Sequence, residues 1–451
     1  MAKRSENMVL SALLAVAGYH YDSWRRPGSR MEGWGEFGLI KELVRKAEAA
    51  KFDMVFFGDI AGAGPLPGSD PTIASHYEPV TVMAALSAVT SHVGMVGTAS
   101  TTFLPPFSVA RQFAGLDKLS GGRVGFNAVS SSMGQRNFGL DTMPSGEDRY
   151  RQMAEFLDVA FALWDSWSDD AVVNDRARGM WADPTKIRAI NHKGEFYSVE
   201  GPLNTPRSPQ GRPIIVQAGS SDAGTNVGAK YADAIYTQQP EFGASVAFYD
   251  MFKDKARSFG RDPRTVKIIA GIVPILGETE AEARELEADL ASYVNTDLGR
   301  INIGERLEMD LSELDLDEKI PAEWFVGPKV QSRSRYENTK KLVLDEGYTL
   351  RDLIHVNARS HGHQAITGTP AQVADRMIEW YDNHACDGFN INTPFMPGGF
   401  DLVTELLVPE LVSRGYFREE YEGSTLRSHL GLERPGAWDA EQSEREHVAV
   451  G

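Results

Sequence analysis

The chain has 451 residues, of which 42% are hydrophobic, and its 63 acidic and 46 basic residues give a formal net charge of -17. Such an acidic surface repels phosphate backbones and anionic lipid headgroups, which argues against nucleic acid and membrane surfaces as partners. Because Cys386 is the single cysteine, an intramolecular disulfide and a cysteine metal cluster are excluded.

The first apolar run, residues 8–16, follows two basic residues as a signal peptide would. It is only as long as a buried strand, and no convincing cleavage site follows it, so it is interpreted as the first core strand. No stretch of the sequence approaches the roughly 18 continuous apolar residues of a membrane span. These features predict a soluble, cytoplasmic protein.

Seven further runs along the chain are also apolar on both faces. Helical patterns separate the first five runs, as in residues 36–50, where apolar residues recur on one helical face. The eight predicted strands are residues 8–16, 52–59, 93–101, 123–131, 213–219, 233–239, 266–277 and 387–394. Strands that are buried on both faces and joined by helices indicate a parallel sheet, and eight of them favour an α/β fold, the (β/α)8 TIM barrel.

Two stretches interrupt this alternation. Residues 170–210 are polar and contain a hairpin-like segment at 192–201, and residues 295–350 are charged and poorly periodic. A structureless loop as long as the second stretch is expected in a compact domain only as a lid or a disordered insert. We therefore expect one barrel over residues 1–432 with insertions near 170–210 and 295–350, followed by a loose tail over 433–451.

Polar and mostly neutral residues follow the predicted strands at their carboxyl ends, where barrel enzymes have their active sites. They are Asp59, Thr98, Thr101, Thr102, Asn127, Ser130, residues 217–221 and residues 390–393. Paired carboxylates, a Ser–His–Asp arrangement and a strand-end lysine are missing from this set. Such a set favours a reaction whose chemistry is supplied by a cofactor.

Each of these residues also has a purely structural interpretation. Asp59 can cap a turn or a helix, Thr98 fits any strand, and Asn127 can satisfy buried backbone groups. The segment QAGSS at residues 217–221 fits a tight turn and an anion site equally well. The anion site follows from its position between a strand and a helix, because a helix N-terminus presents unpaired N–H groups.

His361 and His363 form an H-x-H pattern in RSHGHQ. Metal-dependent barrel hydrolases carry such a pair on their first strand, but here the pair comes late and no other strand-end histidines complete a site. Metal ligation is therefore the less favoured interpretation, and no metal site is predicted. We instead expect a loop histidine that faces the substrate, His361, as a catalytic candidate. Cys386, next to Ala385, is interpreted as a small core residue.

Five motifs, in this order and spacing, cover nearly the whole chain. They are KFDMVFFGD, the segment from YEPVTVMAALSAVT to RVGFNAVSS, RNFG, SPQGRPIIVQAGSS and GYFREEYEGSTLRSHLGL. Together they resemble the bacterial-luciferase-like flavin monooxygenases, in the branch of the nitrilotriacetate, EDTA and dibenzothiophene-sulfone monooxygenases. The resemblance implies a luciferase-like barrel that receives reduced FMN (FMNH2) from a separate NAD(P)H:flavin reductase and reacts with O2 through a C4a-peroxyflavin to oxygenate a small organic, xenobiotic-type substrate.

The resemblance also implies roles for single residues. The family's flavin-contacting positions fall on Asp59, Thr98, Tyr150 and Ser221, with Asn127 near the isoalloxazine ring as a catalytic and cofactor-binding residue. Ser220, Ser221 and the helix after them would then hold the FMN phosphate, which is the anion expected at QAGSS.

The sequence departs from the family pattern at two positions. The family's H-D-x-R-Y reads GEDRY here, so Gly146 replaces the histidine, and Arg149 is the candidate to supply the missing flavin contact. Arg26 follows Trp24-Arg25 where relatives often carry histidine in W-R-H-P. Neither change touches the strand ends, so the flavin assignment holds, while the substrate is expected to be unusual.

Three other functions compete with the two-component monooxygenase. A deazaflavin-dependent dehydrogenase shares the luciferase-like fold, and a metal-dependent TIM-barrel hydrolase would use the H-x-H pair. A non-catalytic binding protein is the least favoured, because so many polar groups converge on the strand ends. Binding of reduced FMN, reduced deazaflavin or zinc would separate these possibilities. A homo-oligomer, either a dimer or a tetramer, is expected.

Overall fold

A computed structural model of the protein describes residues 4, 6–15, 17–30, 37–62, 77–327 and 333–437. Eight parallel strands form a closed barrel in which each strand pairs with two neighbours and β1 pairs with both β2 and β13. They are β1 (Val9–Leu13), β2 (Met54–Phe57), β3 (Gly94–Ser100), β4 (Val124–Val129), β9 (Ile214–Gln217), β10 (Ala234–Thr237), β11 (Lys267–Leu276) and β13 (Gly388–Asn392). The eight predicted strands and the (β/α)8 barrel are confirmed.

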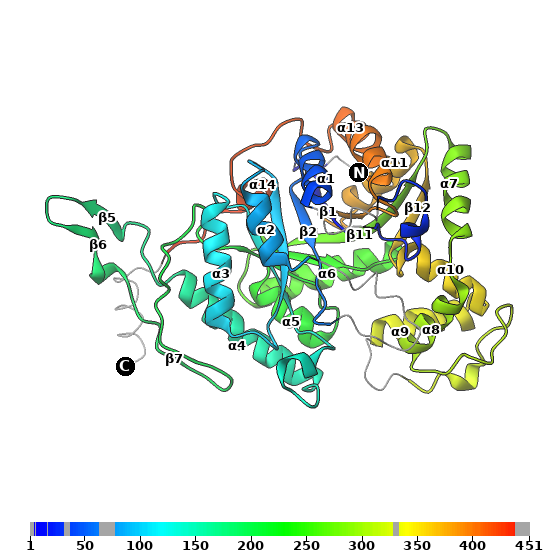
Figure 1. Ribbon diagram of the computed structural model, residues 1–451, viewed down its shortest axis with the longest axis horizontal. Coiled ribbons are helices and arrows are strands. Elements are labelled where there is room, and N and C mark those ends of the chain that lie inside the picture. Colours follow the sequence, from blue (N-terminus) through cyan, green and yellow to red (C-terminus); the bar gives the residue numbers. More distant parts are fainter. Residues whose placement is uncertain are drawn as a thin grey trace.

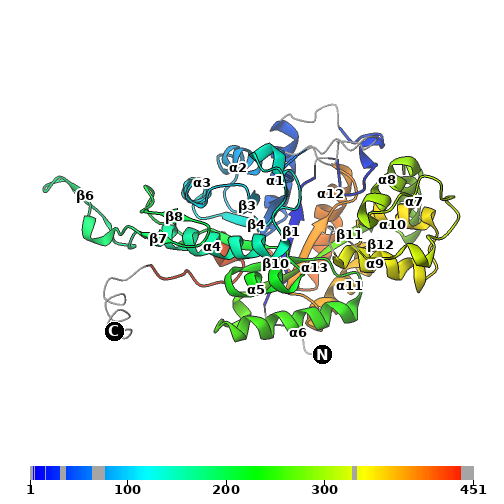
Figure 2. The ribbon, with the colours of Figure 1, turned by 90° about the horizontal axis from the view of Figure 1, so that it is seen from below.

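Amphipathic helices cover the outside of the barrel (Figures 1 and 2). Helix α1 (Phe37–Ala49) illustrates the pattern, because Leu39, Ile40, Leu43, Val44 and Ala47 recur on one face and are buried. The other helices packed around the strands are α2 (Pro79–Ser87), α3 (Pro106–Leu119), α4 (Gly146–Trp164), α5 (Asp222–Tyr231), α6 (Phe242–Ser258), α7 (Glu280–Ser292), α11 (Pro370–Asp382), α12 (Gly398–Leu402) and α13 (Val408–Ser413).

The amino-terminal end of the barrel is closed by the C-terminal segment that contains α14 (Leu426–His429). Leu426, Leu430 and Leu432 pack against apolar side chains that the strands direct into the barrel, among them Val96 and Ile214. A Cβ atom on Gly94 of β3 would lie 2.5 Å from a methyl group of Leu426, so the close contact requires glycine there. With this end filled, the open end is the one formed by the carboxyl ends of the strands, here called the barrel mouth.

The first insertion is an arm of two antiparallel hairpins. Its strands are β5 (Val172–Asp175), β6 (Met180–Ala182), β7 (His192–Lys193) and β8 (Ser198–Val199). The arm extends away from the barrel, on the side opposite to helices α8–α10 (Figures 1 and 2). The predicted hairpin at 192–201 corresponds to β7 and β8.

The second insertion folds into helices with a hydrophobic cluster of their own. Helices α8 (Thr296–Leu307), α9 (Arg333–Leu344) and α10 (Leu350–Ser360), here called the helical insert (residues 295–360), bury Ile303, Tyr336 and Leu353 against one another. The sequence shows no clear period because few apolar residues are spread over several short helices. An additional strand, β12 (Gln364–Gly368), follows and pairs with the outer half of β11, outside the closed barrel.

The start of the predicted C-terminal tail contacts the base of the arm. Arg434 forms an ion pair with Asp169, and Arg207 donates to the carbonyl oxygen of Pro435 at 2.8 Å. Residues 438–451 lie outside the described residues. No helix in the described part of the chain is both long enough and apolar enough to cross a membrane.

Candidate active site at the barrel mouth

Thr98 and Asn127 lie side by side on adjacent strands. They are paired in the register of β3 and β4, and Asn127 Nδ2 donates a hydrogen bond to Thr98 Oγ1 at 2.8 Å. Thr98 Oγ1 in turn donates to the carbonyl oxygen of Phe57 at 2.9 Å. Because side chains alternate along a strand and Val96 points into the barrel, Thr98 and its partner Asn127 point inward as well.

Asn127 carries a polar atom that the described protein leaves unsatisfied. The side chain is only 4% exposed, and no described residue donates to its Oδ1 atom. A buried acceptor without a donor costs about 1 to 3 kcal/mol, so its persistence in a folded barrel points to a bound group that supplies the missing hydrogen bond. The two hydrogen bonds that link Phe57, Thr98 and Asn127 fix the orientation in which Asn127 presents this oxygen.

A second polar cluster lies across the barrel mouth from these residues. Tyr236 Oη and His363 Nε2 are 3.1 Å apart with their rings stacked, and Asn392 Nδ2 donates to Tyr236 Oη at 3.3 Å. Asn390 Nδ2 donates to Asn392 Oδ1 at 2.9 Å. A Cβ atom on Gly271 would lie 2.4 Å from His363 Nδ1, so glycine in β11 makes room for the imidazole.

This cluster contains His363 and Tyr236, which the sequence did not single out as site residues. The alternation within residues 233–239 directs Tyr236 to the same face as Ala234, which lines the barrel, and that signal could have found it. His363 was part of the H-x-H pattern, but only the folded chain brings it to β10 and β11.

His361, the histidine predicted to be catalytic, lies instead against the loop after β1. It ends α10 in a left-handed backbone conformation with φ of 51°, and its Nε2 atom is 2.9 Å from the carbonyl oxygen of Tyr19. Its ring centroid lies 4.6 Å from that of Tyr19 and 3.9 Å from that of Tyr21. These contacts hold His361 between the helical insert and the barrel. Its catalytic role stays a prediction.

The junction between β9 and α5 brings together Ser220, Ser221 and Tyr150. Ser221 caps α5, because its hydroxyl accepts a hydrogen bond from the Gly224 amide at 3.2 Å, and both serines are exposed. Cβ atoms on Gly219 and Gly224 would lie 3.0 and 2.9 Å from Tyr150 Oη. The two glycines thus allow the phenol of α4 to approach the backbone at the start of α5.

Arg149, next to Tyr150, occupies the space beside Gly146. A Cβ atom on Gly146 would lie 3.7 Å from Arg149 Nη2, and Arg149 Nε is buried without a hydrogen-bond partner in the described part of the chain. Burial lowers the pKa of the Arg149 guanidinium, an effect that the neighbouring Tyr150 partly opposes. Arg149 thus adds a positive charge beside Tyr150, the side chain that contacts the β9–α5 junction.

Asp59 follows β2 at the barrel mouth. Partial burial of its carboxyl group raises its pKa to about 6, with a further contribution from Glu78, while a hydrogen bond from the Ile60 amide acts in the opposite direction. The residue as a whole is exposed, so its carboxyl group is accessible from the mouth.

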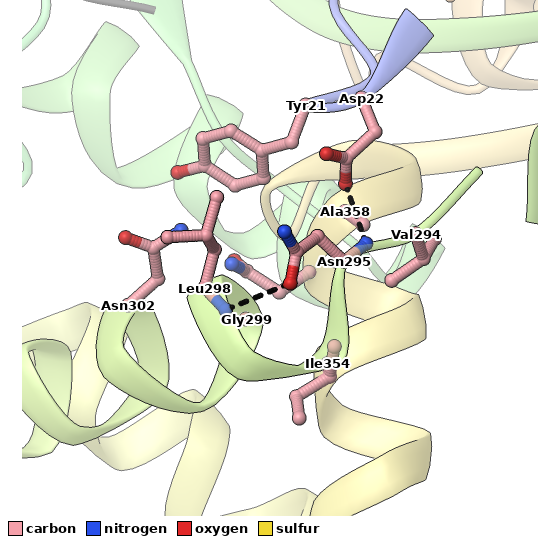
Figure 3. Close-up of a pocket in the computed structure, with 10 residues that line it drawn as sticks. Tyr21, Asp22, Val294, Asn295, Leu298, Gly299, Asn302, Ile354 and Ala358 are labelled. Carbon is pink, nitrogen blue, oxygen red and sulfur yellow. Dashed lines mark hydrogen bonds between the residues drawn. The ribbon is translucent and has the colours of Figure 1, made fainter. Parts of the chain in front are cut away.

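The loop after β1 ties the helical insert to the barrel (Figure 3). Asp22 Oδ2 accepts a hydrogen bond from the Asn295 amide at 3.1 Å, and Asn295 Oδ1 accepts one from the Leu298 amide at 3.2 Å, which caps α8. Arg26, at the position where relatives often carry histidine, forms an ion pair with Asp289 at 2.7 Å. The cavity beside these residues, of about 30 Å³, has room for water only.

The site contains no recognisable metal centre. Within residues 4–437, as far as the structure describes them, no three His, Cys, Asp or Glu side chains come together in a way that could hold a metal ion. Cys386 is buried, and burial strongly raises the pKa of its thiol, as expected for a core residue.

A closed barrel whose mouth is lined mostly with neutral hydrogen-bonding groups, next to the N-terminus of α5, is typical of a cofactor-dependent barrel enzyme. Comparison with known proteins agrees: residues 18–385 match the family of luciferase-like monooxygenases. The chain is 40% identical over 438 residues to N-acetyl-S-(2-succino)cysteine monooxygenase of Bacillus subtilis, covering 96% of this chain and 99% of that protein.

Two further comparisons give the same result. The chain is 39% identical over 447 residues to nitrilotriacetate monooxygenase component A of Aminobacter aminovorans, covering 96% of this chain and 98% of that one. The crystal structure of a riboflavin lyase with modified FMN and riboflavin has a TM-score of 0.84 at 26% identity, covering 96% and 97% of the two chains.

The chain belongs to the luciferase-like monooxygenase family. It is a flavin-dependent oxidoreductase of the monooxygenase class, and the resemblance to the nitrilotriacetate monooxygenase branch is confirmed. The dehydrogenase and hydrolase alternatives are not favoured, because the close relatives are named as monooxygenases.

Proposed function

We propose that the protein is the oxygenating component of a two-component monooxygenase. It binds FMNH2 supplied by a separate NAD(P)H:flavin reductase and places one oxygen atom of O2 on a small organic substrate, while the other oxygen atom is reduced to water. The observation that carries the proposal is the unsatisfied Asn127 Oδ1 atom in the barrel mouth, an acceptor positioned for a ring N–H group.

The residues of the mouth fit the ring end of a flavin. Asn127 would accept from a flavin N–H, and Thr98 holds the amide in the orientation that leaves Oδ1 available. Phe56, which is buried in the barrel interior, supplies an apolar floor beneath the ring. Asp59, at the rim, would be a hydrogen-bond partner for the polar part of the cofactor.

The β9–α5 junction fits the phosphate end. The positive end of the α5 dipole, the hydroxyls of Ser220 and Ser221, the Tyr150 phenol and the Arg149 guanidinium are all suited to a phosphate dianion. Arg149 would take the place of the histidine that relatives carry at the position of Gly146. His361 remains a proposed catalytic residue at the insert side of the mouth.

The bound flavin supplies the electrons that activate O2. The chain's own contribution is to hold the ring, orient it through Asn127, and exclude water from the reacting face. Phe56, which faces the barrel interior, is suited to that exclusion, whereas Phe57 packs in the core outside the barrel and Trp24 is 36% exposed. The Tyr236–His363 pair lies where it could donate a proton to, or accept one from, the substrate side of the ring.

Two of the relatives support an anionic substrate class. These two relatives are named for N-acetyl-S-(2-succino)cysteine and nitrilotriacetate, which are small molecules with several carboxylates. We propose a small organic acid as substrate for this chain, within the xenobiotic-type class.

The assembly and the compartment are also proposals. We propose a homo-oligomer, a dimer or a tetramer, that acts in the cytoplasm, where NAD(P)H is available to the reductase. Light scattering of the purified protein measures the mass, and a monomer at micromolar concentration would contradict the assembly.

Cofactor titration tests the proposed function. Under anaerobic conditions the protein should bind FMNH2 more tightly than oxidised FMN, and it should bind reduced deazaflavin or zinc weakly. Oxidation of a substrate should require FMNH2 or a reductase that produces it. Tighter binding of reduced deazaflavin than of FMNH2 would contradict the assignment and favour the dehydrogenase.

A further inference from the structure

A cavity of about 340 Å³ lies between the helical insert and the barrel mouth. It is lined by residues of α8, α9 and α10, by the loop between β10 and α6, and by the start of β12. Its volume falls in the range of small-molecule sites, and it is more than ten times that of the cavity beside Asp22. The flavin residues Thr98, Asn127, Tyr150 and Ser221 are not part of its lining.

The lining divides into an apolar part and a polar part. Ile303, Leu342, Leu353 and Val356 from the three helices of the insert supply the apolar part. The polar part carries both charges: Gln238, Asn338, Thr339, Asn357, Ser360, His363 and Gln364 are uncharged, Arg306, Lys341 and Arg359 are cationic, and Glu241 and Glu346 are anionic, with Glu241 paired to Lys341. Such a division suits a ligand with an apolar body and a polar end.

Two buried polar atoms in this lining lack a partner in the described structure. Asn357, which lines both this cavity and the small one beside Asp22, is 4% exposed, and its Oδ1 atom accepts no hydrogen bond from any described residue. Arg359 Nε is likewise buried without an acceptor, although its Nη1 atom donates to Glu287 at 2.6 Å. A carboxylic ligand that also carries an N–H or O–H group would satisfy both atoms, because carboxylate oxygens accept from guanidinium groups and Asn357 Oδ1 accepts from a donor.

The cavity meets the barrel interior at His363. This residue lines the cavity, and its Nε2 atom contacts Tyr236, whose ring packs 5.9 Å from that of Phe56 inside the barrel. Gln238, two residues beyond Tyr236, also lines the cavity. A ligand held there would therefore lie next to the side of the mouth that is opposite to Thr98 and Asn127.

We propose that this cavity is the binding site of the organic substrate, and that it selects a small carboxylic acid with an apolar portion. The carboxylate is bound by Arg359, with Arg306 on the same lining, and the apolar portion packs on Leu342, Leu353 and Val356. The inference rests on the proposed function, because the substrate is defined as what the flavin in the mouth oxygenates.

Filling the cavity tests its role. Leu342→Trp places a large side chain in the lining, whereas Leu344→Trp, at an exposed position of the same helix, is the matched control. Calorimetry with nitrilotriacetate and N-acetyl-S-(2-succino)cysteine should show at least about a tenfold loss of affinity in the first variant and none in the control. Equal affinity in both variants would overturn the proposal, as would failure of both acids to bind the wild type below about 1 mM.

A second pair of variants tests the charge. Arg359→Gln removes the guanidinium. Glu287→Gln breaks the same ion pair but keeps the guanidinium of Arg359. The acids should bind at least about tenfold more weakly to the first variant, and with equal or higher affinity to the second. If both variants lose affinity equally, the ion pair acts structurally and the proposed carboxylate contact is wrong.

Flavin titration of the same variants separates the two proposals. FMNH2 affinity should be unchanged in all four, because none of the substituted residues belongs to the flavin site. A wild type that binds the acids but no flavin would contradict the proposed function alone, and a wild type that binds flavin but neither acid would contradict the substrate site alone.

Discussion

The two sides of the barrel mouth are built in different ways. On the side of β3, β4 and β9, the site depends on backbone geometry: strand register pairs Thr98 with Asn127, and glycines bring Tyr150 to the start of α5. On the side of β10 and β11, it depends on side chains from a separate insert, which is tied to the barrel by contacts such as that of Asp22 with Asn295. Backbone geometry tolerates little change, whereas the helical insert packs as a unit around a hydrophobic cluster of its own.

This difference suggests that the two sides of the mouth bind different ligands. The geometrically rigid side suits a constant ligand, the flavin, while the insert side suits the ligand that differs among relatives, the substrate. Variants on the first side should therefore change flavin binding, and variants on the second side should change substrate turnover while flavin binding stays the same.

The largest effect is expected for Ser221→Asp on the flavin side. Aspartate is as good a helix cap as serine, so α5 should keep its stability. Its carboxylate would oppose the phosphate in a partly desolvated site, which costs about 2 to 3 kcal/mol and lowers FMNH2 affinity by about a hundredfold. Anaerobic fluorescence titration measures the affinity; an unchanged value at unchanged thermal stability would remove the phosphate assignment.

Gly219→Ala should have the next largest effect. The added Cβ atom would lie 2.9 Å from the Gly224 Cα atom and 3.0 Å from Tyr150 Oη, so the junction must shift. We expect FMNH2 affinity to fall by about tenfold and the protein to lose about 1 to 3 kcal/mol of stability. Gly243→Ala, where no atom lies within 4 Å of the new Cβ, is the control: because Gly243 lies in the first turn of α6, it should leave FMNH2 affinity unchanged and should not lower stability. Equal behaviour of the two variants would show that close packing at the junction is unimportant.

Gly271→Ala makes the corresponding change on the insert side. Its Cβ atom would lie 2.4 Å from His363 Nδ1 and 2.9 Å from Tyr236 Oη, which forces the imidazole away from the tyrosine. We expect kcat to fall by about three- to tenfold, because the Tyr236–His363 contact is lost, while FMNH2 affinity stays within a factor of two of the wild type, a change of about 0.4 kcal/mol. A parallel loss of flavin affinity would contradict the proposed division of the mouth.

The smallest effect is expected for Asp59→Asn. The pKa of Asp59 is raised from 3.8 to about 6, so between these values the folded protein holds a proton that the unfolded chain has released. Its contribution to the free energy of unfolding therefore decreases as pH rises from about 4 to about 6, and Asp59→Asn should remove this part of the pH dependence. Urea unfolding across this range measures it; identical pH profiles of variant and wild type would show that Asp59 keeps an ordinary pKa.

The fold could be predicted because its signals are local. Each barrel strand is a short run that is apolar on both faces, and helices such as α1 repeat apolar residues on one face. Strand β12 was not predicted, since its residues are only half-buried and do not form an apolar run. Helices α8 and α9 of the insert were not predicted either, because their apolar residues show no clear period, whereas α10 repeats Leu350, Leu353 and Ile354 on one face and its pattern was missed.

Most of the candidate-site residues expected from the sequence lie on the side that backbone geometry defines, while Asn390 and Asn392, which were also expected at a strand end, lie in the Tyr236 cluster. Thr98 and Asn127 follow from their positions near strand ends, and Ser221 from the strand-to-helix junction. The contact between Tyr236 and His363 joins residues 127 positions apart, and nothing local in the sequence pairs them. Within RSHGHQ the sequence favoured His361, although the left-handed turn at His361 and Gly362 is what directs His363 into the mouth.

The most direct test of the account is the reaction of the FMNH2-loaded protein with O2 in a stopped-flow spectrometer, with the wild type and Asn127→Leu compared. If the mouth shelters the reduced flavin through Asn127, the wild type should show a near-ultraviolet transient that outlasts free FMNH2 oxidation. In Asn127→Leu, which lacks the buried acceptor and donor, the transient should be shorter-lived. Oxidation of bound flavin at the rate of free flavin in the wild type, or substrate oxidation with NADH and no reductase, would contradict the account.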